Sequence, residues 1–416
     1  MRTGDMAAVD PARILVVAFS RSSLGHLMRS IAVAEELLRR GHEVLFACAA
    51  ETVHIPRGIG LRCATVHEIG PVPPWTQVKG EEGLRQMARG RLASADYLRA
   101  CLDDECRLID EFRPDLVVSD MRSTAGVAAS MAGVPSVSIH NARLFVFPMS
   151  IVQPMIIEKL REMGIAGEHV DKLLGDVVAI PDYAALEPQS VIPAHIAEFM
   201  HSTLREIRYV GPLLRRAPAE LPGVATLRAE LELGGGPQVL ITFGGSSSGR
   251  EFLPRALEAL TGTLAHFTVI TGPNVSVDDI TPLADKLVAA GARVTVHEFS
   301  DHSMELIKAV DVAVIHGGHG TTMEAILCGT PVICIPHNGE QHENASRSVR
   351  LGTGVIIEHD EIETALPRRL DEMLYGGYAA RAAEVAAGFD GVSGVEQFAA
   401  YVEQHMLPFK GAVSCE

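Results

Sequence analysis

Residues 310–344 constrain the fold of this chain more than any other stretch, because they read as strand, turn, helix and strand in succession. Residues 311–315 are an apolar, valine-rich run of strand length. Residues 316–321 (HGGHGT) follow where the chain must turn tightly before a helix over residues 322–328, and residues 332–335 form a second buried strand. Two strands joined by a helix predict a parallel α/β sheet.

The turn in this segment is suited to an anionic ligand. Its glycines Gly317, Gly318 and Gly320 let the backbone come close to a ligand. The helix that follows begins with free N–H groups, which favour an anion. The second strand runs into a polar segment that contains Glu340 and Gln341. Open α/β sheets bind ligands at the carboxyl ends of their strands, so the segment predicts a site for a pyrophosphate there.

Strands and helices alternate along the whole chain. The first half predicts strands at residues 13–19, 43–48, 61–66, 115–119 and 135–139, with helices at 25–40, 81–112 and 123–131. A proline- and glycine-rich segment then precedes strands at residues 238–243, 267–271, 293–296, 311–315 and 332–335 and a final helix at 393–406. The predicted fold class is α/β, with two Rossmann-like domains facing each other across a cleft.

The predicted domain boundaries follow this alternation, and 416 residues with 47% hydrophobic content can fill two cores. They are a disordered extension at residues 1–12, a first Rossmann-like domain at 13–211, a linker at 212–223, a second Rossmann-like domain at 224–390, and a C-terminal helix at 391–416.

The motifs of the second half resemble one enzyme family. His-Gly-Gly-x-Gly-Thr, a glutamate in the next helix, Gly-x-Pro, and an acidic residue with Gln before Asn-Ala resemble the nucleotide-sugar glycosyltransferases of the GT-B fold. The likeness is to the UDP-glycosyltransferase-like group, in particular the bacterial macrolide and natural-product enzymes of antibiotic biosynthesis. It implies an inverting, metal-independent hexosyltransferase with no cofactor besides its co-substrate. The implied reaction moves a sugar from a dTDP- or UDP-sugar to a hydroxyl of a small-molecule acceptor.

The resemblance assigns the acid–base chemistry to the first half. His26 follows the first strand, where family members carry a Gly-His whose histidine is the general base. Histidine suits that role because it accepts a proton near neutral pH. Asp120 follows another strand and matches the family aspartate that orients this base. Relatives commonly have proline three residues after the histidine, whereas this chain has Arg29, which puts the placement of the acceptor in doubt.

The resemblance also assigns the donor site to residues of the second half. His316 and the turn at Gly318, Gly320 and Thr321 are expected to contact the diphosphate, and Glu324 the ribose hydroxyls. The candidate donor-binding residues are, in chain order, Gly244, Gly245, Ser246, Phe299, His316, Gly318, Gly320, Thr321, Glu324, Glu340 and Gln341.

Some of these assignments rest on weaker patterns. Glu340 and Gln341 match the pair that hydrogen-bonds the transferred sugar, and Gly244 begins a second phosphate-facing loop. Phe299 lies where relatives seat the base of the nucleotide, but a place in the core fits it equally well. The last helix is implied to cross back to the first domain.

Composition and missing motifs exclude other classes. A net charge of −16 argues against nucleic acid as a partner. The first strand is not followed by G-x-G-x-x-G, and the chain has neither a P-loop nor Asp-x-Asp. His319, His337 and His342 are expected to face solvent in loops and not to bind a metal. Without a run long enough to span a membrane or a secretory leader, a cytoplasmic protein is expected, and a homodimer is compatible with the sequence.

Two other functions stay open at this point. A nucleotide-sugar 2-epimerase shares the two-domain architecture, but it needs carboxylates at the sugar for elimination and readdition. A non-catalytic helper protein could also keep the fold. The Gly-His at His26 and the pair Glu340 and Gln341 favour transfer over epimerisation. The presence of His26 and of the whole donor motif argues against a non-catalytic helper.

Overall fold

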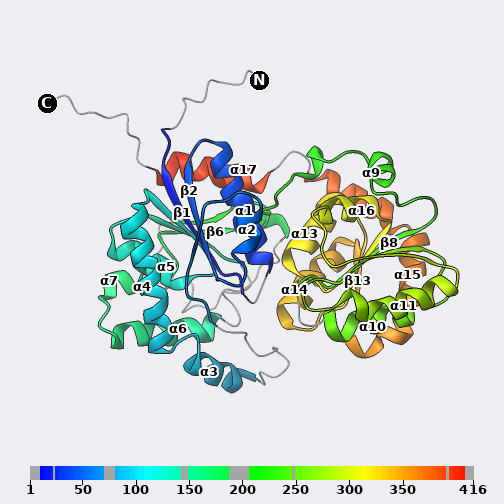
Figure 1. Ribbon diagram of the computed structural model, residues 1–416, viewed down its shortest axis with the longest axis horizontal. Coiled ribbons are helices and arrows are strands. Elements are labelled where there is room, and N and C mark those ends of the chain that lie inside the picture. The colour runs from blue at the N-terminus through cyan, green and yellow to red at the C-terminus, as the bar shows by residue number, and fades with distance from the viewer. Residues whose placement is uncertain are drawn as a thin grey trace.

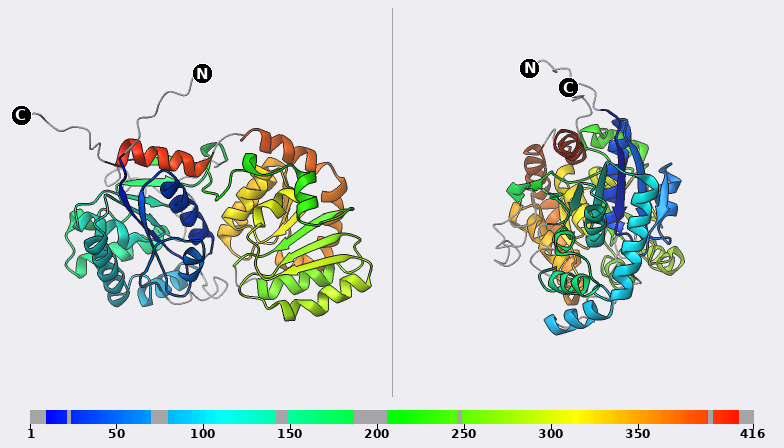
Figure 2. Two further views of the ribbon diagram at one scale, coloured as in Figure 1. Left: turned by 45° about the horizontal axis from the view of Figure 1, so that its top comes forward. Right: turned by 90° about the vertical axis from the view of Figure 1, so that its left-hand side faces the viewer.

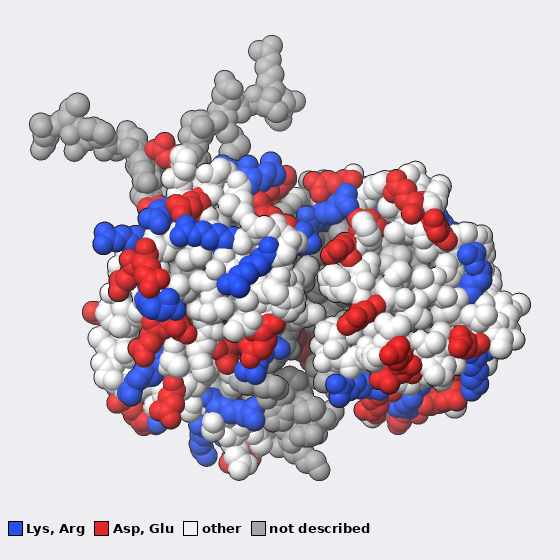
Figure 3. Space-filling view, in the orientation of Figure 1, with Lys and Arg blue, Asp and Glu red and all other residues white. Residues whose placement is uncertain are grey.

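The structure is a computed structural model that describes residues 10–21, 24–69, 80–141, 149–186, 206–245, 249–389 and 393–407. Two α/β domains lie side by side, each with helices on both faces of its sheet (Figure 1). The predicted α/β fold class is confirmed. Acidic and basic side chains are interspersed over both domains on the face shown in Figure 3. None of the described helices is long and apolar enough to span a membrane.

Over the described residues, the first domain holds a parallel seven-stranded sheet in the order β3-β2-β1-β4-β5-β6-β7. Its strands are β1 (Arg13–Ala18), β2 (Glu43–Cys48), β3 (Cys63–Thr65), β4 (Leu116–Asp120), β5 (Ser136–Ile139), β6 (Val177–Ile180) and β7 (Glu206–Tyr209). Its helices include α1 (Leu24–Arg39), α2 (His54–Gly58), α3 (Gly80–Gly90), α4 (Ala95–Phe112), α5 (Ser123–Met131), α6 (Met149–Glu162) and α7 (Gly167–Val170). The sequence patterns did not predict β6 and β7.

The second domain holds, over the same described ranges, a parallel six-stranded sheet in the order β10-β9-β8-β11-β12-β13. Its strands are β8 (Gln238–Thr242), β9 (His266–Ile270), β10 (Arg293–His297), β11 (Val312–Ile315), β12 (Val332–Cys334) and β13 (Gly354–Ile356). Its helices include α9 (Val224–Glu230), α10 (Gly249–Ala259), α11 (Val277–Ala289), α12 (Ser303–Ala309), α13 (His319–Cys328), α14 (Gly339–Leu351), α15 (Ile362–Tyr375) and α16 (Tyr378–Ala387).

Each central strand is buried on both faces, which explains its continuous apolar sequence. In β1, Ile14 and Val16 belong to the core that contains Ile31 of α1, whereas Leu15 and Val17 belong to the core under α4 and α5. Neighbouring side chains of a strand point to opposite faces, so one apolar run serves two helical layers.

The strand order reverses direction between β1 and β4 in the first sheet and between β8 and β11 in the second. At such a reversal the connections leave toward opposite faces of the sheet, and a crevice opens at the carboxyl ends of the strands. His26 follows β1 and Asp120 ends β4, whereas Gly244 follows β8 and His316 follows β11. Both groups of candidate residues therefore lie at these crevices.

Two predicted helices have different bounds in the structure. The helix predicted over residues 81–112 is two helices, because Ser94 caps α4 by accepting a hydrogen bond from the backbone N–H of Tyr97. The helix predicted to begin at Thr322 begins at His319, directly after Gly318 in extended conformation. His319, Gly320 and Thr321 are thus in the first helical turn, with N–H groups that no preceding helical carbonyl can satisfy.

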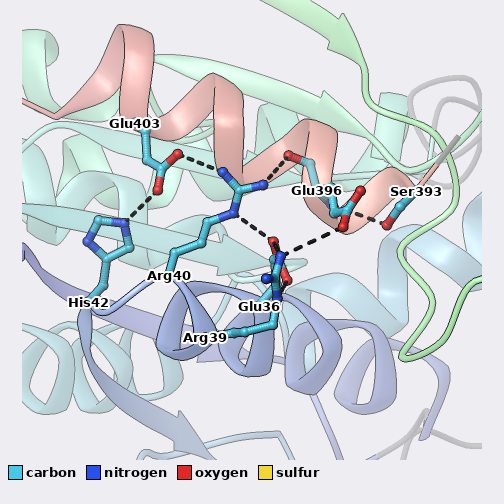
Figure 4. A network of polar contacts seen from close by, with 7 residues as sticks. All are labelled: Glu36, Arg39, Arg40, His42, Ser393, Glu396 and Glu403. Atoms are coloured by element: carbon cyan, nitrogen blue, oxygen red, sulfur yellow. Dashed lines mark hydrogen bonds and ion pairs between the residues drawn. The ribbon is translucent and has the colours of Figure 1, made fainter. Parts of the chain in front are cut away.

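The C-terminal helix α17 (Gly394–Tyr401) and the following turn η6 (Val402–Met406) pack on the first domain (Figures 1 and 2). Glu403 accepts a hydrogen bond from Arg40 Nη1 at 2.7 Å and lies 3.2 Å from His42 Nε2 (Figure 4). Phe398 and Val402 are buried in the same core as Ile31. This end of the chain therefore completes the first domain.

A buried ion pair joins the two domains. Asp182 follows β6 in the first domain, and both of its oxygens accept from Arg347 of α14, at 2.9 and 3.0 Å. His319 Nε2 lies 3.0 Å from the same carboxylate. Burial opposes ionisation of Asp182, yet His319 and Arg347 together hold its pKa below the usual range. Beside this cluster Tyr183 stacks on Phe389 at 4.8 Å between ring centroids.

Replacing Arg347 with methionine should cost about 3–5 kcal/mol of unfolding free energy, because Asp182 then stays buried with only a histidine to compensate its charge. The measurement is urea unfolding at pH 7. Lys286→Gln is the control, since its ion pair with Glu258 is exposed, and it should leave the free energy almost unchanged. Equal, small losses in the two variants would show that the ion pair does not hold the domains together.

Candidate active site

A cavity of about 1200 Å³ lies between the two domains. Its wall brings together residues that are far apart in the sequence and that lie at the crevices of both sheets. Among them are His26, Arg29, Asn141, Gly244, Gly245, Phe299, His316, Gly318, Gly320, Thr321, Glu324, Glu340 and Gln341. Ser246 lies outside the described residues.

His26 and Asp120 form a direct pair. His26 is in the first turn of α1, and its Nδ1 lies 2.9 Å from Oδ1 of Asp120 at the end of β4. The ring of Phe19 meets the imidazole edge-on, with 6.0 Å between centroids. The imidazole N–H at Nδ1 donates to the carboxylate, so Nε2 is left as the proton acceptor.

The carboxylate of Asp120 has further partners. Arg29 donates from Nε to Oδ2 at 2.5 Å and from Nη2 to Oδ1 at 2.6 Å, and the hydroxyl of Ser30 donates to Oδ2 at 3.2 Å. Burial works against the charge of Asp120, but Arg29 and His26 outweigh it and place its pKa below the usual range. Asp120 is therefore ionised at neutral pH.

The chain is strained where it leaves this strand. Met121 has a φ of 54°, which is unusual for a residue with a side chain. Helix α5 begins only at Ser123, and its first turn is not capped by Asp120. The aspartate thus serves the histidine and the arginine, and not the helix that follows.

The imidazole of His316 is held between two glycines. A Cβ atom on Gly244 would lie 3.0 Å from Cε1 of this ring, and one on Gly318 would lie 2.4 Å from Nε2. Burial lowers the pKa of His316 to about 4, and His337 adds to the shift. At neutral pH the ring is uncharged and carries one N–H to donate.

The turn that carries His316 is packed against the start of α14. Gly317 has a φ of 79°, and a Cβ there would lie 2.6 Å from the backbone oxygen of Gln341. The segment before α13 therefore packs on the first turns of α14, where Asn338 accepts from the N–H of Gln341 at 2.9 Å. Two helix N-termini meet at this wall of the cavity, which suits an anion.

The two residues expected at the sugar have different partners. Glu340 is exposed and accepts from Asn141 Nδ2 of the first domain at 3.2 Å. Gln341 is buried, and its Oε1 accepts from the backbone N–H of His337 at 3.0 Å and lies 2.9 Å from His337 Nδ1. Glu340 thus spans the cavity, whereas the side-chain oxygen of Gln341 is used within its own domain.

Phe299 is 56% exposed between β10 and α12, so a place in the core is excluded for it. The expectation that three histidines face solvent was wrong for His319, whose side chain is only 10% exposed because it packs on Asp182. His342 does face solvent, at 48% exposure. His337 is partly buried and bound to Gln341.

Comparison with known proteins identifies the family. Residues 239–393 match the Glycosyltransferase family 28 C-terminal domain. An uncharacterized glycosyltransferase of Methanopyrus kandleri is 30% identical over 309 residues, which cover 70% of this chain and 80% of the relative. The chain belongs to the glycosyltransferases. The resemblance drawn from the glycine-rich turn and its neighbours is therefore confirmed.

Solved structures show that this glycosyltransferase has the GT-B fold. The spinosyn rhamnosyltransferase SpnG, complexed with spinosyn aglycone, superposes with a TM-score of 0.65 at 21% identity over 94% of this chain and 98% of its own. The glycosyltransferase VinC, in complex with dTDP, gives a TM-score of 0.65 at 19% identity over 94% and 99%.

Sequence reasoning missed three residues of the glycosyltransferase that link its domains, Asn141, Asp182 and Arg347. Asn141 and Asp182 each follow a strand, β5 and β6, by two residues. The rule that directed attention to Asp120, a polar residue at the carboxyl end of a buried strand, would have found Asn141. It did not apply to Asp182, because β6 was not predicted. Arg347 lies in the middle of α14 and gives no local signal.

Glu324 gives this glycosyltransferase a pH-dependent stability. Burial raises the pKa of Glu324 to about 7, and the carboxylate of Glu305 raises it further. A glutamate in the unfolded chain has a pKa of roughly 4.3. Between the unfolded and the folded pKa, the folded state binds more protons than the unfolded state, so the free energy of unfolding falls as pH rises. Glu324→Gln removes this titration. It should stabilise the protein at pH 8 by about 1–2 kcal/mol and should give no gain near pH 4.5. This gain is smaller than the full pKa shift would give, because the side chain is partly exposed.

The measurement is urea unfolding of Glu324→Gln and wild type at both pH values. Glu230→Gln, at an exposed position of α9, serves as the control. A gain for Glu324→Gln of the same size at both pH values would contradict the raised pKa.

Proposed function

We propose that this glycosyltransferase transfers a sugar from a dTDP- or UDP-sugar to a hydroxyl of an apolar small molecule, by a single inverting displacement. The observation that carries the proposal is the geometry of the cavity. A histidine oriented by a buried carboxylate, His26 with Asp120 at 2.9 Å, lines one side, and the His316 turn with the N-terminus of α13 lines the other. A base and an anion site across one cavity are what transfer with a diphosphate leaving group needs.

The base is assigned to His26. Because Nδ1 donates to Asp120, Nε2 takes the proton from the acceptor hydroxyl as its oxygen bonds to the anomeric carbon. The bond from that carbon to the diphosphate oxygen breaks on the opposite face of the sugar. The configuration at the anomeric carbon is therefore inverted, and the nucleoside diphosphate leaves with the electron pair.

The leaving group is assigned to the turn between β11 and α13. Backbone N–H groups of Gly320 and Thr321 would donate to the diphosphate, and the uncharged ring of His316 would donate one N–H as negative charge develops. Glu324 would accept from the ribose hydroxyls. These donors can stabilise the leaving group without a metal ion. The complex of VinC with dTDP supports a thymidine or uridine diphosphate here.

The acceptor is assigned to the part of the cavity that the first domain lines. Many side chains of that wall are apolar, and they include Phe19, Ile59, Met87, Leu92, Met121, Val152 and Ile156. An apolar body with one hydroxyl near His26 fits such a surface. The aglycone held by SpnG supports an acceptor of this kind.

His26→Ala should lower turnover roughly 100- to 10,000-fold, the usual contribution of a general base, while the affinity for nucleoside diphosphate stays nearly unchanged. Asp120→Asn should cost less, because the proton acceptor remains although its orientation suffers. The measurement is turnover of both variants with a phenolic and an aliphatic acceptor, with nucleotide affinity determined by calorimetry.

The phenol should partly rescue both variants, since it ionises with less help. Near wild-type turnover of His26→Ala on an aliphatic hydroxyl would refute the assignment of His26 as the base. Another residue of the first domain would then have to accept the proton.

Gly318→Ala should weaken the binding of dTDP or UDP at least about tenfold, because the new methyl group would displace the ring of His316. Gly223→Ala is a matched control. Both glycines precede a helix in extended conformation, at φ −62° and −65°, but a Cβ on Gly223 meets nothing within 4 Å. Calorimetric titration checks this, and equal affinity of the two variants would count against the diphosphate site at His316.

A nucleotide-sugar 2-epimerase is separated from this proposal by an experiment without acceptor. An epimerase would convert the donor sugar alone, whereas a transferase leaves it intact or hydrolyses it slowly.

A further inference from the structure

Arg29 stands where the family resemblance implies a proline, and its guanidinium contacts both Asp120 and Asn141. It is 7% exposed and binds Asp120 through two nitrogens, at 2.5 and 2.6 Å, while Nη1 donates to Asn141 Oδ1. We propose that Arg29 is a positioning residue that lowers the pH at which the His26–Asp120 pair loses its proton and ties this pair to Glu340 across the cavity. The inference rests on the proposed role of His26 as base.

The charge of Arg29 acts on the proton of the pair. A carboxylate beside an imidazole stabilises the protonated ring, and a guanidinium on the same carboxylate offsets part of that effect. Arg29 binds both oxygens of Asp120, one of which also faces His26. The pair therefore releases its proton at a lower pH than Asp120 and His26 would alone.

Other groups around the pair do not replace this effect. His140, which follows β5, has its pKa lowered to about 4 by burial, so it is uncharged where the base must work. Ser30 offers a neutral hydroxyl, and Phe19 offers the edge of its ring. Among the described residues, Asn141 connects the carboxylate of Glu340 to the cluster.

The link to Glu340 depends on which way the carboxamide of Asn141 faces. A guanidinium can only donate, so the atom of Asn141 that faces Arg29 must be the oxygen. The amide nitrogen is then turned toward Glu340, whose Oε1 accepts at 3.2 Å. Without Arg29 this orientation is no longer fixed. A proline at position 29 could neither pair with Asp120 nor orient Asn141.

Arg29→Met tests the effect of the charge. Without the guanidinium the pair keeps its proton to higher pH, whichever of its two members carries it. The acid limb of the pH profile of kcat/KM should therefore move upward by roughly one pH unit. Nuclear magnetic resonance of protein with labelled histidine gives a readout independent of activity: the His26 signal, assigned by its loss in His26→Ala, should titrate at correspondingly higher pH.

Arg122→Met is the matched control. Arg122 is 2% exposed and donates from two nitrogens to Glu105, at 3.0 and 2.7 Å, and the hydroxyl of Thr124 donates to the same carboxylate at 3.1 Å. The control should lose stability like Arg29→Met but leave the pH limb and the His26 titration where they are in the wild type.

Arg29→Lys separates charge from shape. Lysine keeps the positive charge but lacks the planar guanidinium. The acid limb of the kcat/KM profile should therefore stay near its wild-type position, while the carboxamide of Asn141 is no longer held in its orientation. The KM for the sugar donor should then rise about threefold or more, as it should in Asn141→Ala. The double variant should be no worse than either single variant, because both changes break the same link.

The outcomes are distinct. An inactive His26→Ala together with an Arg29→Met whose pH limb and His26 titration are unchanged would overturn the inference and leave the proposed function standing. A fully active His26→Ala would overturn the proposed function instead. If Arg29→Met does not fold, additive effects of Arg29→Lys and Asn141→Ala on the donor KM would overturn the link to Glu340, and non-additive effects would support it.

Discussion

Parallel strand pairing is the constraint on which the rest of this structure depends. All of the pairings between described strands are parallel, so each sheet ends all of its strands at one edge. The reversal of strand order then opens one crevice per sheet, between β1 and β4 and between β8 and β11. Asp120 lies at such a strand end, and Asn141, Gly244 and His316 follow one within two residues. In the proposed function, the base lies at the crevice of the first sheet and the anion site at the crevice of the second, so transfer requires the two edges to face each other.

The facing of the edges is held by contacts that also begin at strand ends. Asp182 leaves the carboxyl end of β6 and binds Arg347 and His319 of the second domain. Because His319 is the first residue of α13, the ion pair that joins the domains is continuous with the turn assigned to the diphosphate. A change of domain orientation and a change at that turn are therefore coupled through one buried carboxylate.

The sequence predicts the parts of this structure that have a local signal. Continuous apolar runs located β1, β4, β8 and β11, and the polar residues after β1, β4 and β11 located His26, Asp120 and the His316 turn. The short edge strand β7 was not predicted, because its side chains are partly or fully exposed and do not form a continuous buried apolar run. The break between α3 and α4 was not predicted, because a single capping residue such as Ser94 does not interrupt the helical pattern of apolar residues. Asp182 and Arg347 are 165 residues apart, and no local pattern announces such a pair.

Arg29 shows why a departure from a family pattern is best interpreted after its partners are known. In the sequence it indicated only that the acceptor might be placed differently. In the structure its guanidinium lies on the carboxylate of Asp120, and the residue also lines the cavity. The charges of a buried aspartate and of the arginine bound to it nearly cancel. A histidine that shares the aspartate can therefore gain and lose a proton without leaving an uncompensated negative charge in the core. In the role proposed for His26, Arg29 would stabilise the deprotonated state from which a base accepts a proton.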